Sequence, residues 1–160
     1  MQYVFDTTEQ TTASGNAAET RALLHLLCFD ADRGKIDAFA IDCFNDVTGM
    51  DDPSTALFDV QSKATTSTSP RQIGKDLVTL YKNYVSEFAS FFKSYTLFLG
   101  GVSSTVLADN SLTCFCFEDI RPESQKKVKD GLREACVAKG YLDGSLVTDE
   151  STEQFLQADS

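Results

Sequence analysis

The chain has 160 residues, 42% of them hydrophobic, and a net charge of −10. This length and composition predict one ordinary globular domain with an apolar core. A run of about 18 apolar residues, which a membrane span needs, does not occur in the sequence. The polar, acidic N-terminus also lacks the basic start and apolar middle of a secretory signal. We therefore expect a cytoplasmic protein without a membrane span.

The negative net charge bears on whether the protein binds nucleic acid. Phosphate contacts need Lys and Arg, so a charge of −10 argues at first sight against a nucleic-acid binder. A metal-dependent nuclease, however, concentrates carboxylates in its site and can gather its basic residues on one face. Residues 143–160 also hold five of the acidic residues and no Lys or Arg. The net charge therefore does not exclude DNA as a partner.

The five cysteines are an odd number and form no CxxC pair. A disulfide framework favours an even count in a smaller chain, and a structural zinc site needs about four Cys or His ligands at characteristic spacing. We therefore expect buried, reduced thiols, which pack as small hydrophobic side chains. They are Cys28, Cys43, Cys114, Cys116 and Cys136.

The first half of the chain predicts a helix followed by a hairpin. Asn16 has the type of a helix N-cap, and Glu19 follows it at the spacing of a capping box, which predicts a helix over 17–29. Alternating residues predict strands over 36–44 and 56–64. The turn-forming residues of 45–53 lie between these two strands, which we expect to pair antiparallel.

The second half predicts two long helices with two strands between them. Ser69 as N-cap and Pro70 at the first helical position open a helix over 70–92, whose apolar residues recur at helical intervals. Short apolar runs predict strands over 95–99 and 112–117. The last helix runs over 122–139 and ends at Gly140 as a left-handed cap. This order predicts an α/β fold with a central mixed β-sheet flanked by helices.

The end of the chain differs from the rest. We expect one domain in residues 1–140, and in residues 141–160 an acidic linker or the start of a truncated C-terminal region. Residues 153–157 have the pattern of a starting helix, for which we expect no partner for Phe155 and Leu156.

A chemical site is indicated by Asp59, Gln61 and Lys63, which alternate and so share one face of the second strand. Mg²⁺ prefers oxygen ligands and keeps waters that can act as nucleophiles. A nearby ammonium can orient or deprotonate such a water and stabilise the developing charge. This grouping suits phosphodiester hydrolysis. Further oxygens are available from Asp42 and Asp46, around the turn before this strand, and from Glu19; Asp59 could add another.

Each of these residues also has a simpler interpretation. The row of Asp59, Gln61 and Lys63 could be a solvated strand face. Glu19 could complete a capping box, and Asp42 and Asp46 could be turn residues. His25, the single histidine, lies among leucines and is interpreted as a packed or boundary residue of the first helix.

The segment "ETRALLHLL…DCFNDVTG…FDVQSK" resembles the PD-(D/E)XK nuclease superfamily. That pattern is a helix with an acid, a strand pair with an Asp, an acid-x-Lys strand and a further helix; here "FDVQSK" has Gln in place of the acid. The closer resemblance is to the CD-NTase-associated double-stranded DNA endonucleases of bacterial anti-phage defence, and it covers residues 15–101. It implies a restriction-endonuclease-like core.

The resemblance also implies roles for single residues. Asp46 would be the main metal ligand, Gln61 would take the third position of the motif, and Lys63 would be the catalytic lysine. Asp42 stands where the family has Glu, and Asn45 replaces an Asp. Catalysis would then rest on Lys63, Gln61 and Asp46, with Mg²⁺ or Mn²⁺ held by the ligand set Asp46, Asp42, Gln61 and Glu19.

The expected substrate is double-stranded DNA. Arg71, Lys75 and Lys82 share a face of the predicted helix after the site strand and are candidates for DNA binding, or else a solubilising surface. The resemblance further implies a homo-oligomer in the active state and a C-terminal sensor or oligomerisation region in the full-length protein. The alternative function is a catalytically inactive module with the nuclease fold that binds DNA or a partner protein.

Overall fold

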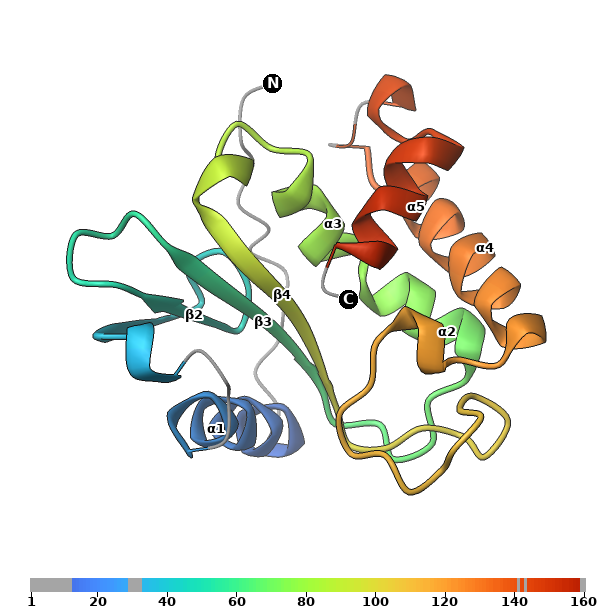
Figure 1. The fold of residues 1–160 in the computed structure, drawn as a ribbon, viewed down its shortest axis with the longest axis horizontal. Helices are drawn as coiled ribbons and strands as arrows, with labels where there is room; N and C mark the ends of the chain where they lie inside the picture. The colour runs from blue at the N-terminus through green and yellow to red at the C-terminus, as the bar shows by residue number, and fades with distance from the viewer. Residues whose placement is uncertain (1–12, 29–32, 141, 143, 159–160) are drawn as a thin grey trace.

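The computed structural model describes residues 13–28, 33–140, 142 and 144–158. Helix α1 packs on one face of a four-stranded sheet, and the other α-helices gather on the opposite side (Figure 1). The predicted α/β class with a mixed sheet and flanking helices is confirmed. The helices described are α1 (Ala13–Cys28), α2 (Pro70–Asp76), α3 (Val78–Tyr84), α4 (Pro122–Ala138) and α5 (Asp149–Gln157), and the strands are β1 (Ala38–Ile41), β2 (Val47–Met50), β3 (Leu57–Lys63) and β4 (Phe92–Leu99).

The strands lie in the order β1-β2-β3-β4. The first three form an antiparallel meander, in which Val47 lies opposite Val60. Strand β4 runs parallel to β3, with Gln61 opposite Leu97. A parallel pair needs a long crossover, which α2 and α3 supply. The site strand β3 is therefore an inner strand, bordered by β2 on one side and β4 on the other.

Each face of the sheet has its own apolar cluster. On the α1 face, Ala22 and Leu26 pack against Val47 and Val60. On the opposite face, Leu80 and Tyr81 of α3 are fully buried in a cluster with residues of α4 and α5. Alternation along β3 thus sends even-numbered side chains toward α1 and odd-numbered ones toward α3.

The two strands predicted to form a hairpin do not pair with each other, because strand β2 lies between them. The strand expected over 36–44 is shortened to Ala38–Ile41, and the turn expected over 45–53 contains strand β2. A tight turn in which Asp42 has a positive φ of 55° joins β1 to β2. Strand β2 was missed because its four residues include Gly49 and are surrounded by turn-forming residues. Strands on both of its sides supply the hydrogen bonds that its local sequence does not predict.

The helix predicted over 70–92 is interrupted. Its start is confirmed: the Ser69 hydroxyl accepts a bond of 3.3 Å from the Gln72 amide, and Pro70 is the first helical residue. It divides into α2 and α3 around Leu77 and ends at Tyr84. Phe88 and Phe92 extend the helical spacing in sequence, yet Phe92 opens strand β4.

Several local expectations are wrong. Residues 112–117 form no strand, and Leu112 is exposed in a loop. Helix α1 begins at Ala13, before the expected N-cap Asn16, and its expected last residue Phe29 lies outside the described residues. Helix α4 ends at Ala138, and Gly140 has no positive φ. Of the cysteines, three are exposed rather than buried: Cys28, Cys43 and Cys114.

Helices α2 and α4 touch through their backbones at two glycines. A Cβ atom on Gly74 would lie 2.0 Å from the Val128 carbonyl oxygen, and one on Gly131 would lie 2.1 Å from the Arg71 carbonyl oxygen. Any side chain at either position would push the helices apart. This contact fixes α4 beside α2, and so determines where the C-terminal end of α4 lies.

Helix α5 confirms the helix expected at the end of the chain, but the expectation that Phe155 lacks a partner is wrong. Phe155 is buried, with its ring centroid 5.3 Å from that of Tyr81 and 5.8 Å from that of Tyr95. Ion pairs from α4 also hold α5, through Lys129 to Glu153 and Arg133 to Asp149. The division of the chain at residue 140 stays a prediction. No helix in the described residues has the length and apolar character to span a bilayer.

Candidate active site

The odd-numbered polar residues of β3 share a face, as predicted, and this face meets α2 and α3. Asp59 is 0% exposed and Gln61 is 3% exposed, whereas Lys63 is partly exposed at the end of the strand. The interpretation as a solvated strand face is therefore wrong for Asp59 and Gln61. Buried polar groups of this kind need hydrogen-bond partners, which neighbouring elements supply.

Asp59 is the centre of a buried network. Its Oδ2 accepts bonds from Nδ2 of Asn83 at 2.6 Å and from Nδ2 of Asn45 at 2.5 Å, and its Oδ1 accepts one from the Thr48 hydroxyl at 3.3 Å. Burial raises the pKa of this carboxyl to about 6, although the three donors and the charge of Lys82 act in the opposite direction. Asp59 thus ties the turn before β2 to α3 through hydrogen bonds to both of its carboxylate oxygens.

Asp46 lies where β2 separates from β3, and it gathers donors from both faces of the sheet. Its Oδ2 accepts bonds from Gln61 Nε2 at 2.7 Å, from the Ser62 amide at 2.6 Å and from the Ser62 hydroxyl at 2.7 Å. No donor among the described residues is bonded to Oδ1. The carboxylate is thus held firmly by one oxygen while the other keeps its lone pairs for a further contact.

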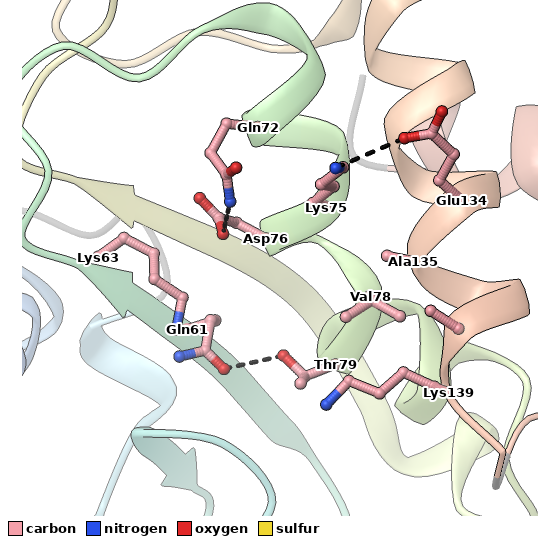
Figure 2. Close-up of a pocket in the computed structure, with 11 residues that line it drawn as sticks. Gln61, Lys63, Gln72, Lys75, Asp76, Val78, Thr79, Glu134, Ala135 and Lys139 are labelled. Atoms are coloured by element: carbon pink, nitrogen blue, oxygen red, sulfur yellow. Dashed lines mark hydrogen bonds and ion pairs between the residues drawn. The ribbon is translucent and has the colours of Figure 1, made fainter. Parts of the chain in front are cut away.

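The Gln61 amide bridges Asp46 to α3. Its Nε2 also lies 3.4 Å from the Ser62 carbonyl oxygen, and its Oε1 accepts a bond of 2.8 Å from the Thr79 hydroxyl (Figure 2). A half-turn of the amide exchanges its oxygen and nitrogen. Oε1 would then join the Asp46 carboxylate and the Ser62 carbonyl, and Nε2 would donate to Thr79. Three oxygens around one point suit a hard cation such as Mg²⁺.

The structure gives the other two expected ligands, Asp42 and Glu19, different surroundings. Asp42 is exposed in the turn, and no hydrogen bond joins its carboxylate to Asp46 among the described residues. Glu19 is partly exposed on α1, on the face of the sheet toward which the Ser62 side chain points. The described residues contain no group of three His, Cys, Asp or Glu side chains that could hold a metal. Of the four predicted ligands, Asp46 and Gln61 are brought together.

A cavity of about 380 Å³ opens beside Gln61, between β3 and helices α2, α3 and α4. Lys63 extends along its wall so that its ammonium lies next to the Gln61 amide (Figure 2). Asp76 lines the same cavity and accepts a bond of 2.8 Å from Gln72. Burial raises the pKa of Asp76, while Gln72 and the charge of Lys63 counteract the shift. The site thus places an amide, an ammonium and a carboxylate around a space open to solvent.

The three predicted DNA-binding residues do not share a face. Arg71 and Lys75 are exposed, and both contact Glu134 of α4, Lys75 at 3.5 Å. Lys82 is 3% exposed, so it does not present its ammonium at the surface. The expected common face assumed one continuous helix, whereas the break at Leu77 makes Lys82 part of α3.

Sequence reasoning missed several partners at the site. Thr79, Asn83 and Asp76 lie on the helices after β3, and Lys139 reaches the cavity from the end of α4. The first three had a signal, since they recur on α2 and α3 as polar residues within an apolar helical pattern. Lys139 had none, because a lysine at a helix end is ordinary in any sequence. His25 packs near Phe98, at a centroid distance of 5.9 Å, as expected.

No family model matches the chain, and no curated protein or solved structure does.

Proposed function

We propose that this chain is a Mg²⁺- or Mn²⁺-dependent endonuclease domain that hydrolyses phosphodiester bonds of double-stranded DNA. The observation that carries the proposal is the convergence of Asp46, Gln61 and the Ser62 carbonyl beside Lys63. The order of elements adds support: a helix, antiparallel strands, the Gln-x-Lys strand and a capped helix follow one another as in the PD-(D/E)XK pattern. A restriction-endonuclease-like core is part of this proposal.

The roles of the residues follow from their positions. Asp46 and Gln61 would hold the metal through oxygen, and Thr79 would accept a bond from the turned amide of Gln61. A bound Mg²⁺ lowers the pKa of a coordinated water and polarises the phosphate. Lys63 would orient the attacking water with its ammonium and stabilise the negative charge that develops on the phosphate.

The direct test is plasmid cleavage in Mg²⁺ or Mn²⁺ by the wild type, Lys63→Ala and Lys93→Ala. Lys93 is an exposed lysine of β4 outside the cavity and serves as the matched control. General acid–base groups contribute about 10²- to 10⁴-fold, so Lys63→Ala should lose cleavage by that factor. EDTA should abolish it, and Lys93→Ala should cut normally. Equal cleavage by both variants would contradict the role of Lys63.

A second candidate function is a catalytically inactive module that binds DNA or a partner protein. It is favoured by one observation: the Gln61 amide already satisfies Asp46 by a hydrogen bond without a cation. Calorimetric titration with Mn²⁺ separates the two functions. Binding that is lost in Asp46→Asn supports the nuclease, whereas a wild type that binds no Mn²⁺ and cuts no DNA supports the module.

The cellular role and the oligomeric state are part of the same proposal. The domain would act in the cytoplasm as an effector of anti-phage defence, with duplex DNA as substrate. A homo-oligomer would be the active form, and a C-terminal sensor or oligomerisation region would control its assembly in the full-length protein. Cleavage measured against protein concentration tests this, because an enzyme that is active only as a dimer loses specific activity on dilution.

A further inference from the structure

Besides Lys75, which contacts Glu134, the cavity beside Gln61 has a further ammonium that the proposed chemistry does not use. Lys63 enters from β3, and Lys139 follows the last residue of α4 on the opposite wall. Figure 2 shows the Lys139 side chain extending across the cavity toward Thr79, so that the two ammonium groups lie on either side of the Gln61–Thr79 hydrogen bond. Two cations therefore approach one polar point from separate elements.

The charge of the cavity differs from that of the chain. Its lining includes Lys63, Lys75 and Lys139 against two carboxylates, in a chain with a net charge of −10. Both carboxylates have partners at or beside the cavity: Glu134 contacts Arg71 and Lys75, and Asp76 accepts from Gln72 and interacts with the charge of Lys63. A concave, locally positive site on an acidic protein attracts anions, because low-dielectric walls focus the field.

We propose that this cavity binds a backbone phosphate of the DNA strand, and that Lys139 is a phosphate-binding residue. Lys63 and Lys139 contact its oxygens from the two walls, and the Thr79 hydroxyl lies between them. This inference rests on the proposed nuclease function, since it supplies the DNA contact that the buried Lys82 does not. Phosphate contacts of this kind fix the position of a strand and carry no sequence information.

The position of α4 explains how Lys139 comes to face β3. The backbone contact at Gly74 and Gly131 sets α4 against α2, and the helix ends one residue before Lys139. A lysine at a helix C-terminus also interacts favourably with the helix dipole, which is a structural role that needs no ligand. The test must therefore measure a property that this structural role does not change.

That property is the salt dependence of DNA binding. A short labelled duplex is titrated in EDTA at several salt concentrations with wild type, Lys139→Gln, Lys139→Arg and Lys126→Gln. Lys126 is an exposed lysine of α4 outside the cavity. Loss of one phosphate contact reduces the slope of log Kobs against log salt by about 0.9. We expect this change in Lys139→Gln, with Lys139→Arg and Lys126→Gln close to wild type. A slope in Lys139→Gln equal to that of Lys126→Gln overturns the proposal.

A second probe separates this inference from the nuclease proposal. If the wild type binds no duplex, inorganic phosphate is titrated instead and followed by calorimetry. Phosphate binding that Lys139→Gln loses and Lys126→Gln keeps supports an anion cavity in a protein that is not a nuclease. A wild type that binds neither duplex nor phosphate overturns the cavity as an anion site. Thermal unfolding of each variant shows whether a loss reflects binding or folding.

Discussion

The two ends of the polar row on β3 face the same helical layer but have opposite properties. Asp59 is enclosed, and each of its oxygens is bonded to Asn83, Asn45 or Thr48. Gln61 and Lys63, at the other end, border a cavity open to solvent. The same alternation thus builds an internal brace at one end and a site with reactive groups at the other. What differs is whether the neighbouring elements enclose the row completely, as at Asp59, or leave a cavity beside it, as at Gln61 and Lys63.

The largest expected effect on stability comes from removing the buried carboxylate of Asp59. Asp59→Ala leaves the amides of Asn45 and Asn83 without their buried acceptor, and each such loss costs about 1–3 kcal/mol. We expect the free energy of unfolding to fall by about 2–4 kcal/mol in urea denaturation, while Lys63→Ala changes it by less than about 0.5 kcal/mol. Asp52→Ala, an exposed carboxyl in a turn, is the control. A Lys63→Ala variant destabilised as much as Asp59→Ala would remove the contrast.

The pH dependence of stability, measured without metal, tests the same buried network around Asp59. The pKa of Asp59 is about 6 in the folded state against 3.8 unfolded, so the folded state holds this proton more tightly. Below pH 3.8 the contribution to stability is fully present, and it is lost as pH rises through 6. Relative to Asp59→Asn, the wild type should lose about 3 kcal/mol of unfolding free energy over this range. Parallel pH profiles of the two proteins would show that Asp59 titrates normally.

Disturbing the packing of α4 against α2 tests the end of the polar row that borders the cavity. Gly131→Ala places a methyl group against the Arg71 carbonyl, and overpacking of this kind costs about 1–3 kcal/mol. Because α4 must shift, DNA binding should weaken together with stability. Gly140→Ala is the matched control, since a Cβ atom at that position meets nothing within 4 Å. A Gly131→Ala variant with a wild-type melting temperature would argue against close backbone packing of α2 and α4.

The smallest expected effect is at the hydroxyl that holds the Gln61 amide. Thr79→Val keeps the shape of the side chain and removes its bond to Gln61. A hydrogen bond contributes about 1 kcal/mol, so Mn²⁺ affinity measured by calorimetry should weaken about fivefold. Thr79→Ser restores the hydroxyl and should recover the affinity. If Thr79→Ser remains as weak as Thr79→Val, the methyl group rather than the hydroxyl matters.

The sequence predicted the site strand better than its surroundings. Strict alternation placed Asp59, Gln61 and Lys63 on one face, and the Ser69–Pro70 cap placed the start of the following helix. Alternation does not reveal burial: the partners of Asp59, for example, are Asn45 and Asn83, whose contacts depend on the tertiary fold. The same limit applies to Lys139, which lines the same cavity as Lys63 because of how α4 packs.

The errors in secondary structure also have physical causes. Strand β2 is recognisable by its neighbours rather than by its own residues, since Val47 and Thr48 are followed by Gly49. The periodic spacing of Phe88 and Phe92 continues the pattern of a helix that ends at Tyr84. Residues 112–117 form an apolar run like that of a buried strand, but no strand of the described sheet pairs with them.

The parallel pairing of β3 with β4 has a consequence for how the chain reaches this structure. The β2–β3 hairpin joins neighbouring segments and can form early, whereas β4 pairs only after the crossover through α2 and α3 has closed. During that interval one edge of β3 is unpaired, and such edges invite association between chains. We expect the polar side chains of Asp59, Gln61 and Lys63 to make the unpaired strand a poor template for aggregation. Two of the residues proposed for catalysis, Gln61 and Lys63, would thus also protect the chain before it is folded.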